Sequence, residues 1–317
     1  MSKFKQADLR KVKTISVRNR KSKVHLKDFA QVYEPDKQSF SKFTKSLPHI
    51  LVAQDLRLFI DDIANAVKKK KPVIVMIGAH VIKVGLSPLL IDLIKQNVIT
   101  AIAMNSAAAI HDVETAMWGK TSEDVEENIL NGTFGMSRET GEFINGVLNN
   151  AMTLDDSGYG EALGKALQKA PKKNLSLLAS CYRFDIPVTV HAAIGTDIIH
   201  QQPTMNGAAT GEMTFRDFKV FCNVVKNLGN GGVVMNIGSN VILPEVFLKA
   251  LTVARNLGFN AQGFSAANFD MIQHYRPRMN VVTRPTQKSG KGYMFTGHHE
   301  IMIPLVCAMI KERLRLR

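Results

Sequence analysis

Four residues that can carry acid–base chemistry lie shortly after short apolar runs of the chain. Imidazoles and carboxylates serve as general acids and bases, and a lysine amine near positive helix ends can act as a base or form an imine. Each lies just past an expected strand, where open parallel sheets bind ligands. The candidate catalytic residues are His80, Lys83, His111 and Asp197.

Small or polar residues end all five expected strands. Such residues let backbone N–H groups approach an anion, although glycine and asparagine also simply form turns. Five such ends together favour a ligand site along one edge of the sheet. The segments are 78–80, 105–107, 191–197, 238–240 and 265–268.

The elements that position these residues alternate along the chain. Apolar, β-branched runs separated by amphipathic helices are typical of parallel βαβ units. We predict an α/β fold, a Rossmann-like parallel sheet flanked by helices, with residues 131–172 as an insertion. Strands are expected at 72–78, 98–104, 186–193, 232–237 and 260–265. Helices are expected at 55–69, 88–97, 113–118, 122–130, 174–183, 214–228, 244–257 and 300–315.

The N-terminal residues carry much of the net charge of +14. We expect a basic arm over residues 1–45 and a single domain over 46–317. The arm is either solvated, placed over a neighbouring subunit, or bound to RNA or a membrane. Its few aromatic side chains make nucleic acid the weaker expectation. Its cations include Lys3, Lys5, Arg10, Lys11, Lys13, Arg18, Arg20, Lys21 and Lys23.

Other classes of protein find little support in the sequence. The apolar runs at 72–78 and 301–310 are too short to span a bilayer, so we expect a cytoplasmic protein without membrane contact. Three widely spaced cysteines indicate reduced thiols rather than a metal site. No dinucleotide fingerprint follows an expected strand, and the sequence has no P-loop, zinc motif or hydrolase elbow.

Several separated segments resemble deoxyhypusine synthase, most closely its bacterial paralogues. The resemblance runs from about residue 50 to the C-terminus and implies an NAD-binding, Rossmann-like homotetramer with sites between subunits. In the characterised enzymes, NAD oxidises spermidine, and a lysine holds the aminobutyl group as an imine before passing it to a translation factor. The segments are 78–85, 105–112, 120–125, 132–136, 187–200 and 265–270.

The lysine nucleophile of that family is missing where the resemblance places it. Thr286 occupies the position and cannot form a Schiff base. Lys288 and Lys291 lie nearby and could supply a displaced nucleophile, but Gly290 and Gly292 beside them indicate a mobile loop.

The expected substrate end has gained cations where the family has carboxylates for a polyamine. Guanidinium groups should reject a polycation and suit a carboxylate or phosphate, unless they face solvent. The substrate-binding candidates are His274, Arg276 and Arg284. The cofactor-binding candidates are Asn105, Ser106, Asp112, Thr196, Gly238, Ser239, Ser265, Ala266 and Asp270.

These observations predict a deoxyhypusine synthase-like enzyme that binds NAD or a related nucleotide. Its substrate is expected to be a small amine or amino acid that also carries a negative group, rather than spermidine. One alternative is an inactive, ligand-binding pseudoenzyme of the same fold. A second is an RNA-associated protein that acts through the basic arm.

Overall fold

The computed structural model describes residues 7, 9–16, 18–19, 24–35 and 39–316. The chain divides into two compact units between Gln54 and Asp55, whereas we expected the boundary at residues 45/46. The first unit contains two 3-10 turns, Leu9–Lys11 and Leu26–Asp28, and helix α1, Phe40–Ser46. Of the arm's cations, Lys3, Lys5, Arg20, Lys21 and Lys23 lie outside the described residues.

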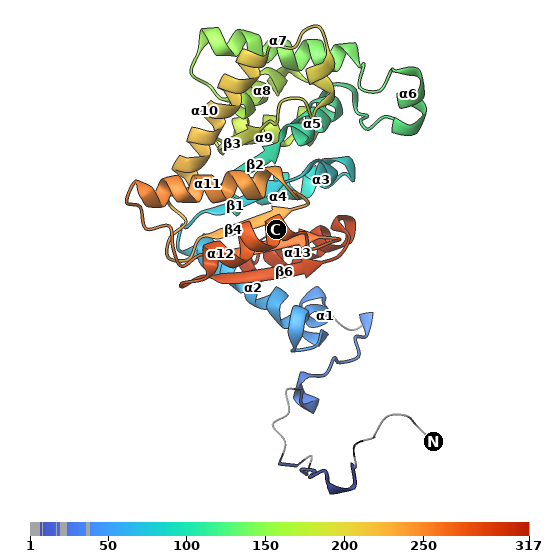
Figure 1. Ribbon diagram of the computed structural model, residues 1–317, viewed down its shortest axis with the longest axis vertical. Coiled ribbons are helices and arrows are strands. Elements are labelled where there is room, and N and C mark those ends of the chain that lie inside the picture. Colours follow the sequence, from blue (N-terminus) through green and yellow to red (C-terminus); the bar gives the residue numbers. More distant parts are fainter. Residues whose placement is uncertain (1–6, 8, 17, 20–23, 36–38, 317) are drawn as a thin grey trace. The chain divides into compact units, whose positions relative to one another are not determined.

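A six-stranded parallel sheet forms the centre of the second unit, in the order β3-β2-β1-β4-β5-β6 (Figure 1). The order reverses between β1 and β4, which is where doubly wound folds bind dinucleotides. Every residue of β1, β3, β4 and β5 is buried, as strands covered on both faces must be. The strands are β1 Val73–Ile77, β2 Ala101–Asn105, β3 Val188–His191, β4 Val233–Ile237, β5 Ser265–Asp270 and β6 Lys291–Thr296.

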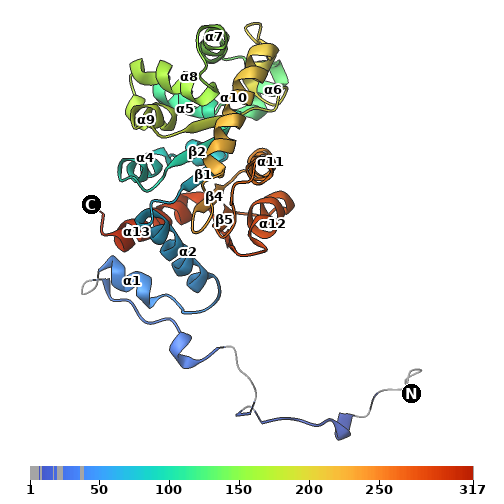
Figure 2. The same cartoon turned by 90° about the vertical axis from the view of Figure 1, so that its left-hand side faces the viewer.

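Helices cover both faces of the sheet, with α4, α9 and α13 on one side and α11 and α12 on the other (Figure 2). Within the described residues, no helix is long and apolar enough to cross a membrane. The helices are α2 Leu51–Lys68, α3 Ala79–Lys83, α4 Ser87–Lys95, α5 Ser106–Trp118, α6 Val125–Asn131, α7 Arg138–Leu154, α8 Tyr159–Ala166, α9 Leu177–Arg183, α10 Gly207–Val225, α11 Ile242–Asn256, α12 Arg284–Thr286 and α13 His299–Leu314. Shorter turns are η4 Leu167–Lys169, η5 Lys173–Leu175, η6 Ile198–Gln201 and the π-helix η7 Pro277–Thr283.

The packing of α11 illustrates how the pattern of the sequence fixes the helices on the sheet. Leu243, Phe247 and Leu251 recur every four residues and are all buried against β1, β4 and α10. Burial of each such side chain contributes roughly 1.5–3 kcal/mol. This apolar face holds the amino end of α11 beside the carboxyl end of β4.

Two strands differ from the prediction. The predicted strand 260–265 is wrong, because β5 begins at Ser265, and Gly263 has a positive φ of 70° that breaks an extended run before it. Strand β6 was read as a mobile loop. It is an edge strand in which Tyr293 and Phe295 face the core, while Met294 between them faces solvent.

The predicted insertion contains two helices. Helices α7 and α8 occupy most of residues 131–172, and both contact α10. Their apolar residues Ile144, Leu148 and Leu163 are fully buried. The segment is therefore part of the layered fold and forms the cover over β3.

Candidate functional site

A cavity of about 740 Å³ opens at the carboxyl ends of β1, β2 and β3. Lys83 from α3, His111 from α5, and Thr196 and Asp197 after β3 lie on its wall. The rest of the wall comes from α5, from the start of α6 and the loops on either side of it, from the first turn of α7 and from η6. Three of the four candidate catalytic residues therefore share one cavity.

A chain of hydrogen bonds orients His111. The Thr121 hydroxyl donates to Glu114 Oε2 at 2.5 Å, and His111 Nδ1 lies 2.6 Å from Thr121 Oγ1. Because the hydroxyl has a single hydrogen, which it gives to the carboxylate, His111 Nδ1 must be the donor to Thr121. The neutral ring then has its lone pair on Nε2, as a general base requires.

Asp197 and His200 form a second titratable pair at this cavity. Their side chains are only 5% and 4% exposed, and His200 Nε2 lies 3.8 Å from Asp197 Oδ2. His200 Nδ1 accepts from the backbone N–H groups of Gly195 and Asp197, at 3.1 and 3.2 Å, so Nε2 carries the hydrogen of the neutral ring. The Ser106 hydroxyl donates to Asp197 Oδ2.

Asp197 and Glu114, two of the four carboxylates on the cavity wall, have environments that move their pKa values apart. Burial raises the pKa of Asp197, and the Ser106 hydroxyl and the nearby histidines only partly oppose it. Burial would also raise the pKa of Glu114, but hydrogen bonds with His111, Thr121 and Thr140 lower it below its usual value. Such a separation is typical of a site with distinct acid and base roles.

Lys83 reaches the cavity but is an exposed side chain. Lys83 is therefore solvated rather than shielded from water, because α3 is a short helix at the rim of the fold. Its exposure suits a contact with a negative ligand group better than the role of a buried, neutral amine.

The fourth candidate, His80, lies at the reversal between β1 and β4. Its ring is 5.6 Å from that of His299, and His299 Nε2 donates to the carbonyl of Phe269 at 3.1 Å. The backbone is tightly packed here, because a Cβ on Gly78 would lie 2.1 Å from the carbonyl oxygen of Gly238. Only glycine at position 78 allows this approach.

Four buried polar atoms at the carboxyl ends of β4 and β5 have no hydrogen-bond partner among the described residues. They are Asn236 Oδ1, Asn240 Oδ1, Asp270 Oδ2 and His299 Nδ1. All four are acceptors, since His299 uses Nε2 as its donor. Buried acceptors of this kind are normally satisfied by water or by a ligand that presents N–H or O–H groups.

Side-chain amides join the carboxyl ends of β4, β5 and β6. Asn236 Nδ2 donates to the Ser239 carbonyl at 2.9 Å and to Asn268 Oδ1 at 2.7 Å. Asn268 Nδ2 donates to Gln273 Oε1 at 2.8 Å, and Gln273 Nε2 donates to the carbonyl of Phe295 at 3.1 Å. Both asparagines are fully buried, so this amide chain fixes the spacing of three strand ends.

Comparison with known proteins identifies the fold. No protein-family model matches the chain, and no curated protein matches it. A structure designated as a deoxyhypusine synthase from Entamoeba histolytica matches 88% of this chain and 96% of its own length, with a TM-score of 0.53 and 10% identity. The chain has the deoxyhypusine synthase fold.

Other structures share the deoxyhypusine synthase fold of this chain. A conserved LOR/SDH protein from Methanococcus maripaludis S2 matches with a TM-score of 0.53 and 14% identity, over 84% of this chain and 71% of its own. AgrE, in a ternary complex with ornithine and NAD+, matches with a TM-score of 0.51 and 12% identity, over 83% of this chain and 33% of its own. This chain thus spans about a third of AgrE.

Asp112 has a structural role in this deoxyhypusine synthase fold. It accepts hydrogen bonds from the Ser176 hydroxyl at 2.5 Å and from the backbone N–H groups of Leu177 and Leu178 at 2.8 and 3.1 Å. Burial raises its pKa to about 6. The predicted cofactor contact is therefore wrong, because the carboxylate is fully buried and holds the first turn of α9.

Ser265 and Ala266 were placed at the wrong edge of the sheet. They begin β5, so they lie at its amino end, and Asp270 lies at its carboxyl end. The Ser265 hydroxyl donates to Asp62 on α2 at 2.7 Å. Asp270 is the candidate of this strand that remains at the carboxyl edge.

The predicted substrate residues lie outside the cavity at β1–β3. Arg276 Nε is 3.3 Å from Glu245 on α11. Arg284 donates to Asn280 at 2.7 Å and to the Tyr275 hydroxyl at 3.0 Å. These guanidinium groups bind neighbours on their own crossover segment and on α11. The residues placed outside are His274, Arg276 and Arg284.

The remaining cofactor candidates lie at the carboxyl edge of the sheet. Some of them already form hydrogen bonds or contacts within the fold. Asn105 Oδ1 accepts from Ala108 N at 3.0 Å and caps α5. Ser239 Oγ accepts from Leu243 N at 3.2 Å in the first turn of α11. Gly238 has a positive φ of 68° and lies against the His299 ring.

Thr286 and Lys291 lie away from the cavity. Thr286 is buried in α12 and donates to the Val282 carbonyl at 2.5 Å. Lys291 begins β6, and its amine donates to Asp62 at 2.7 Å. Lys291 is therefore not a mobile replacement for the missing nucleophile.

Sequence reasoning missed Glu114, Thr121, His200 and His299 as site residues. Glu114 lies three residues after His111 and therefore on the same face of α5, a spacing visible in the sequence. Thr121 reaches the pair only through the loop that follows α5, and no local pattern reports that contact. In the part of the chain that the structure describes, no group of three His, Cys, Asp or Glu could hold a metal ion.

Proposed function

We propose that this chain is an NAD-binding enzyme of the deoxyhypusine synthase fold that acts on a small amine or amino acid with a negative group. The observation that carries the proposal is the Glu114–Thr121–His111 chain of hydrogen bonds on the cavity wall. It fixes the tautomer of His111, and His111 Nε2 then accepts a proton from the substrate ammonium.

The charges on the cavity wall suit a substrate with both signs of charge. Glu123 and Glu139 can hold an ammonium group, while Lys83 and Lys120 can hold a carboxylate. A pure polycation such as spermidine would be repelled by the two lysines. AgrE, which shares the fold, is described in complex with an amino acid, ornithine, together with NAD+, and this supports an amino acid as the substrate class.

The residues at the strand-order reversal fit a dinucleotide. Gly78 and Gly238 leave only backbone between β1 and β4, and Asp270 Oδ2 and His299 Nδ1 are buried acceptors for hydroxyl or amide donors. Gly238, Asp270 and His299 would hold the cofactor on this edge. NAD, when bound, supplies a hydride acceptor for the carbon that bears the amine.

We assign to Asp197 the role of the acid that gives a proton back to the substrate. Its raised pKa favours the protonated form, and His200 and Ser106 hold its carboxyl group in place. The pair of Asp197 and His111 then supplies one proton donor and one acceptor on a single cavity wall.

The test combines binding and turnover. Small molecules released from the purified protein are identified by mass spectrometry, and NAD binding is measured by calorimetry. NADH formation is then followed with a panel of diamines and amino acids. We expect the wild type to bind NAD and to turn over an amino acid. The His111→Asn variant should still bind NAD but should lose turnover. NAD binding without turnover of any member would favour the pseudoenzyme, and no nucleotide binding would contradict the proposal.

A further inference from the structure

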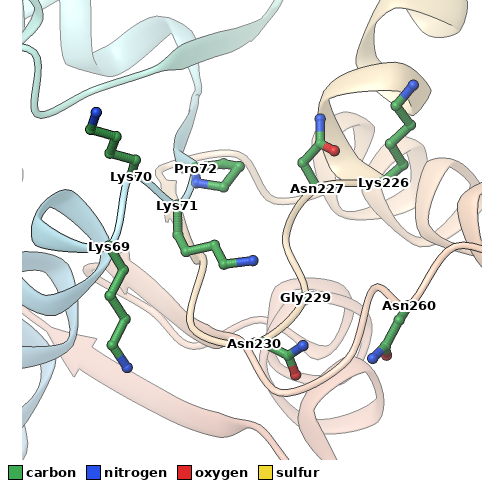
Figure 3. Close-up of a pocket in the computed structure, with 9 residues that line it drawn as sticks. All are labelled: Lys69, Lys70, Lys71, Pro72, Lys226, Asn227, Gly229, Asn230 and Asn260. Atoms are coloured by element: carbon green, nitrogen blue, oxygen red, sulfur yellow. The ribbon is translucent and has the colours of Figure 1, made fainter.

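A second cavity, of about 510 Å³, opens at the opposite edge of the sheet. Its wall comes from the turn between α2 and β1, the loop between α10 and β4, and the loop before β5 (Figure 3). Four lysines and three asparagines line it, with no carboxylate among the nine lining residues. The lysines are Lys69, Lys70, Lys71 and Lys226.

The floor of this cavity is fixed by backbone contacts. Asn230 N donates to the Gln262 carbonyl at 2.8 Å, and Gly231 N donates to the Gly263 carbonyl at 2.9 Å. A Cβ on Gly229 would lie 1.8 Å from the carbonyl oxygen of Asn260. The two loops are therefore held together, and the concave shape does not depend on a ligand.

The directions of the lysines indicate the shape of the ligand. Lys69 and Lys70 point in opposite directions, and Lys226 lies across the cavity from both (Figure 3). A single phosphate would be gripped by donors that converge on one point. Cations spread around a cavity instead suit a chain of phosphates, to which lysine binds as a point charge without reading sequence.

An exposed aromatic ring lies beside these cations. Phe259 is 43% exposed and directly precedes Asn260 in the cavity wall. The Lys226 amine lies 5.1 Å from the centre of its ring. Exposed aromatic faces next to a basic groove are how proteins hold unpaired bases.

We propose that this cavity binds the backbone of a single-stranded nucleic acid, with Phe259 stacking on a base. The site is independent of the enzyme function proposed above, because it lies at the amino ends of β1, β4 and β5. It also differs from the basic arm, which was the only nucleic-acid contact that the sequence suggested.

The test uses the full chain and a fluorescent oligouridylate of about 12 nucleotides, within the range of known single-strand sites. Anisotropy gives the binding constant at several salt concentrations. Each phosphate contact contributes a slope of about 0.7 in the logarithmic salt plot. Lys70→Ala combined with Lys71→Ala should therefore lower the slope by about 1.4. Lys95→Ala combined with Lys169→Ala removes the same charge from exposed lysines outside the cavity and should leave the affinity and slope close to those of the wild type.

Phe259→Leu separates a nucleic acid from other polyanions. It should weaken RNA binding about fivefold or more, the lower end of the range for one stacked base, without changing the salt slope. Binding of inorganic polyphosphate, which has no bases, should not change.

Three results would overturn the proposal. Equal effects of the two lysine pairs would show that only the overall charge matters. An unchanged slope in the cavity variant would assign RNA binding to other residues such as the arm. If the cavity variant with Lys70→Ala and Lys71→Ala lost affinity for vesicles containing phosphatidylserine but kept its affinity for RNA, the cavity would be assigned to a membrane surface instead.

Discussion

The hydroxyl of Thr121 is the smallest group on which the proposed chemistry depends. Thr121→Val keeps the size of the side chain but removes the link between His111 and Glu114. We expect turnover to fall by about tenfold to a hundredfold, part of the usual contribution of a general base. The pH–rate profile should shift as well, because the ring loses its fixed tautomer. Thr121→Ser should restore both, and an unchanged profile in the valine variant would exclude the positioning role.

Lys83 offers a second prediction for a single residue. Because its side chain is exposed, Lys83→Ala should change the free energy of unfolding by no more than about 0.5 kcal/mol. Affinity for a substrate with a negative group should fall, while Lys83→Arg should keep most of it. Thermal unfolding and calorimetry measure the two effects. Equal affinity in the alanine variant would remove Lys83 from the site.

The candidate site was predictable where chemistry follows a strand end directly. Lys83, His111 and Asp197 could be grouped because the carboxyl ends of parallel strands share one edge. Asp112 was misplaced, since the sequence does not show that Ser176 and the start of α9 surround it. His299 was missed because its burial depends on the docking of α13.

Asp217 links three elements and should make stability depend on pH. Its Oδ2 accepts from Gly160 N at 2.8 Å, at the start of α8, and from Val190 N at 2.6 Å, in β3. Burial raises its pKa to about 8. Between the unfolded and folded pKa values the folded protein keeps a proton that the unfolded chain has lost, so stability falls as pH rises.

The measurement compares wild type with Asp217→Asn. The amide oxygen can accept the same two hydrogen bonds but does not titrate. Between pH 6 and pH 8 the wild type should lose up to about 2 kcal/mol of stability in urea titrations relative to the variant. Parallel pH curves for the two proteins would show that Asp217 is ionised throughout this range.

Strands and helices were predictable to the extent that their patterns are local. Helix α11 carries an apolar residue every four positions, and β1 is a continuous apolar run in which four of the five residues are β-branched. Strand β5 consists mainly of small residues and therefore reads as a turn. Strand β6 alternates over only a few residues at the sheet edge, next to glycines, so its pairing with β5 decides its structure.

At the scale of the molecule, the separation into two units leads to a prediction about truncation. Deletion of residues 1–40 leaves α2 and the whole sheet intact, since α2 begins at Leu51. We expect a cooperative thermal transition and ligand binding close to those of the full chain. Loss of the transition would show that the N-terminal residues are part of the packed structure.

The amide chain across β4, β5 and β6 has a consequence for evolution. Asn236 and Asn268 are hydrogen-bonded to each other and are both fully buried. Replacement of one therefore leaves a buried polar group of the other without its partner. Descendants of this chain should therefore keep or lose the two asparagines together, through a paired replacement. Exposed surface residues can diverge one at a time, whereas this part of the sheet can change only by coupled steps.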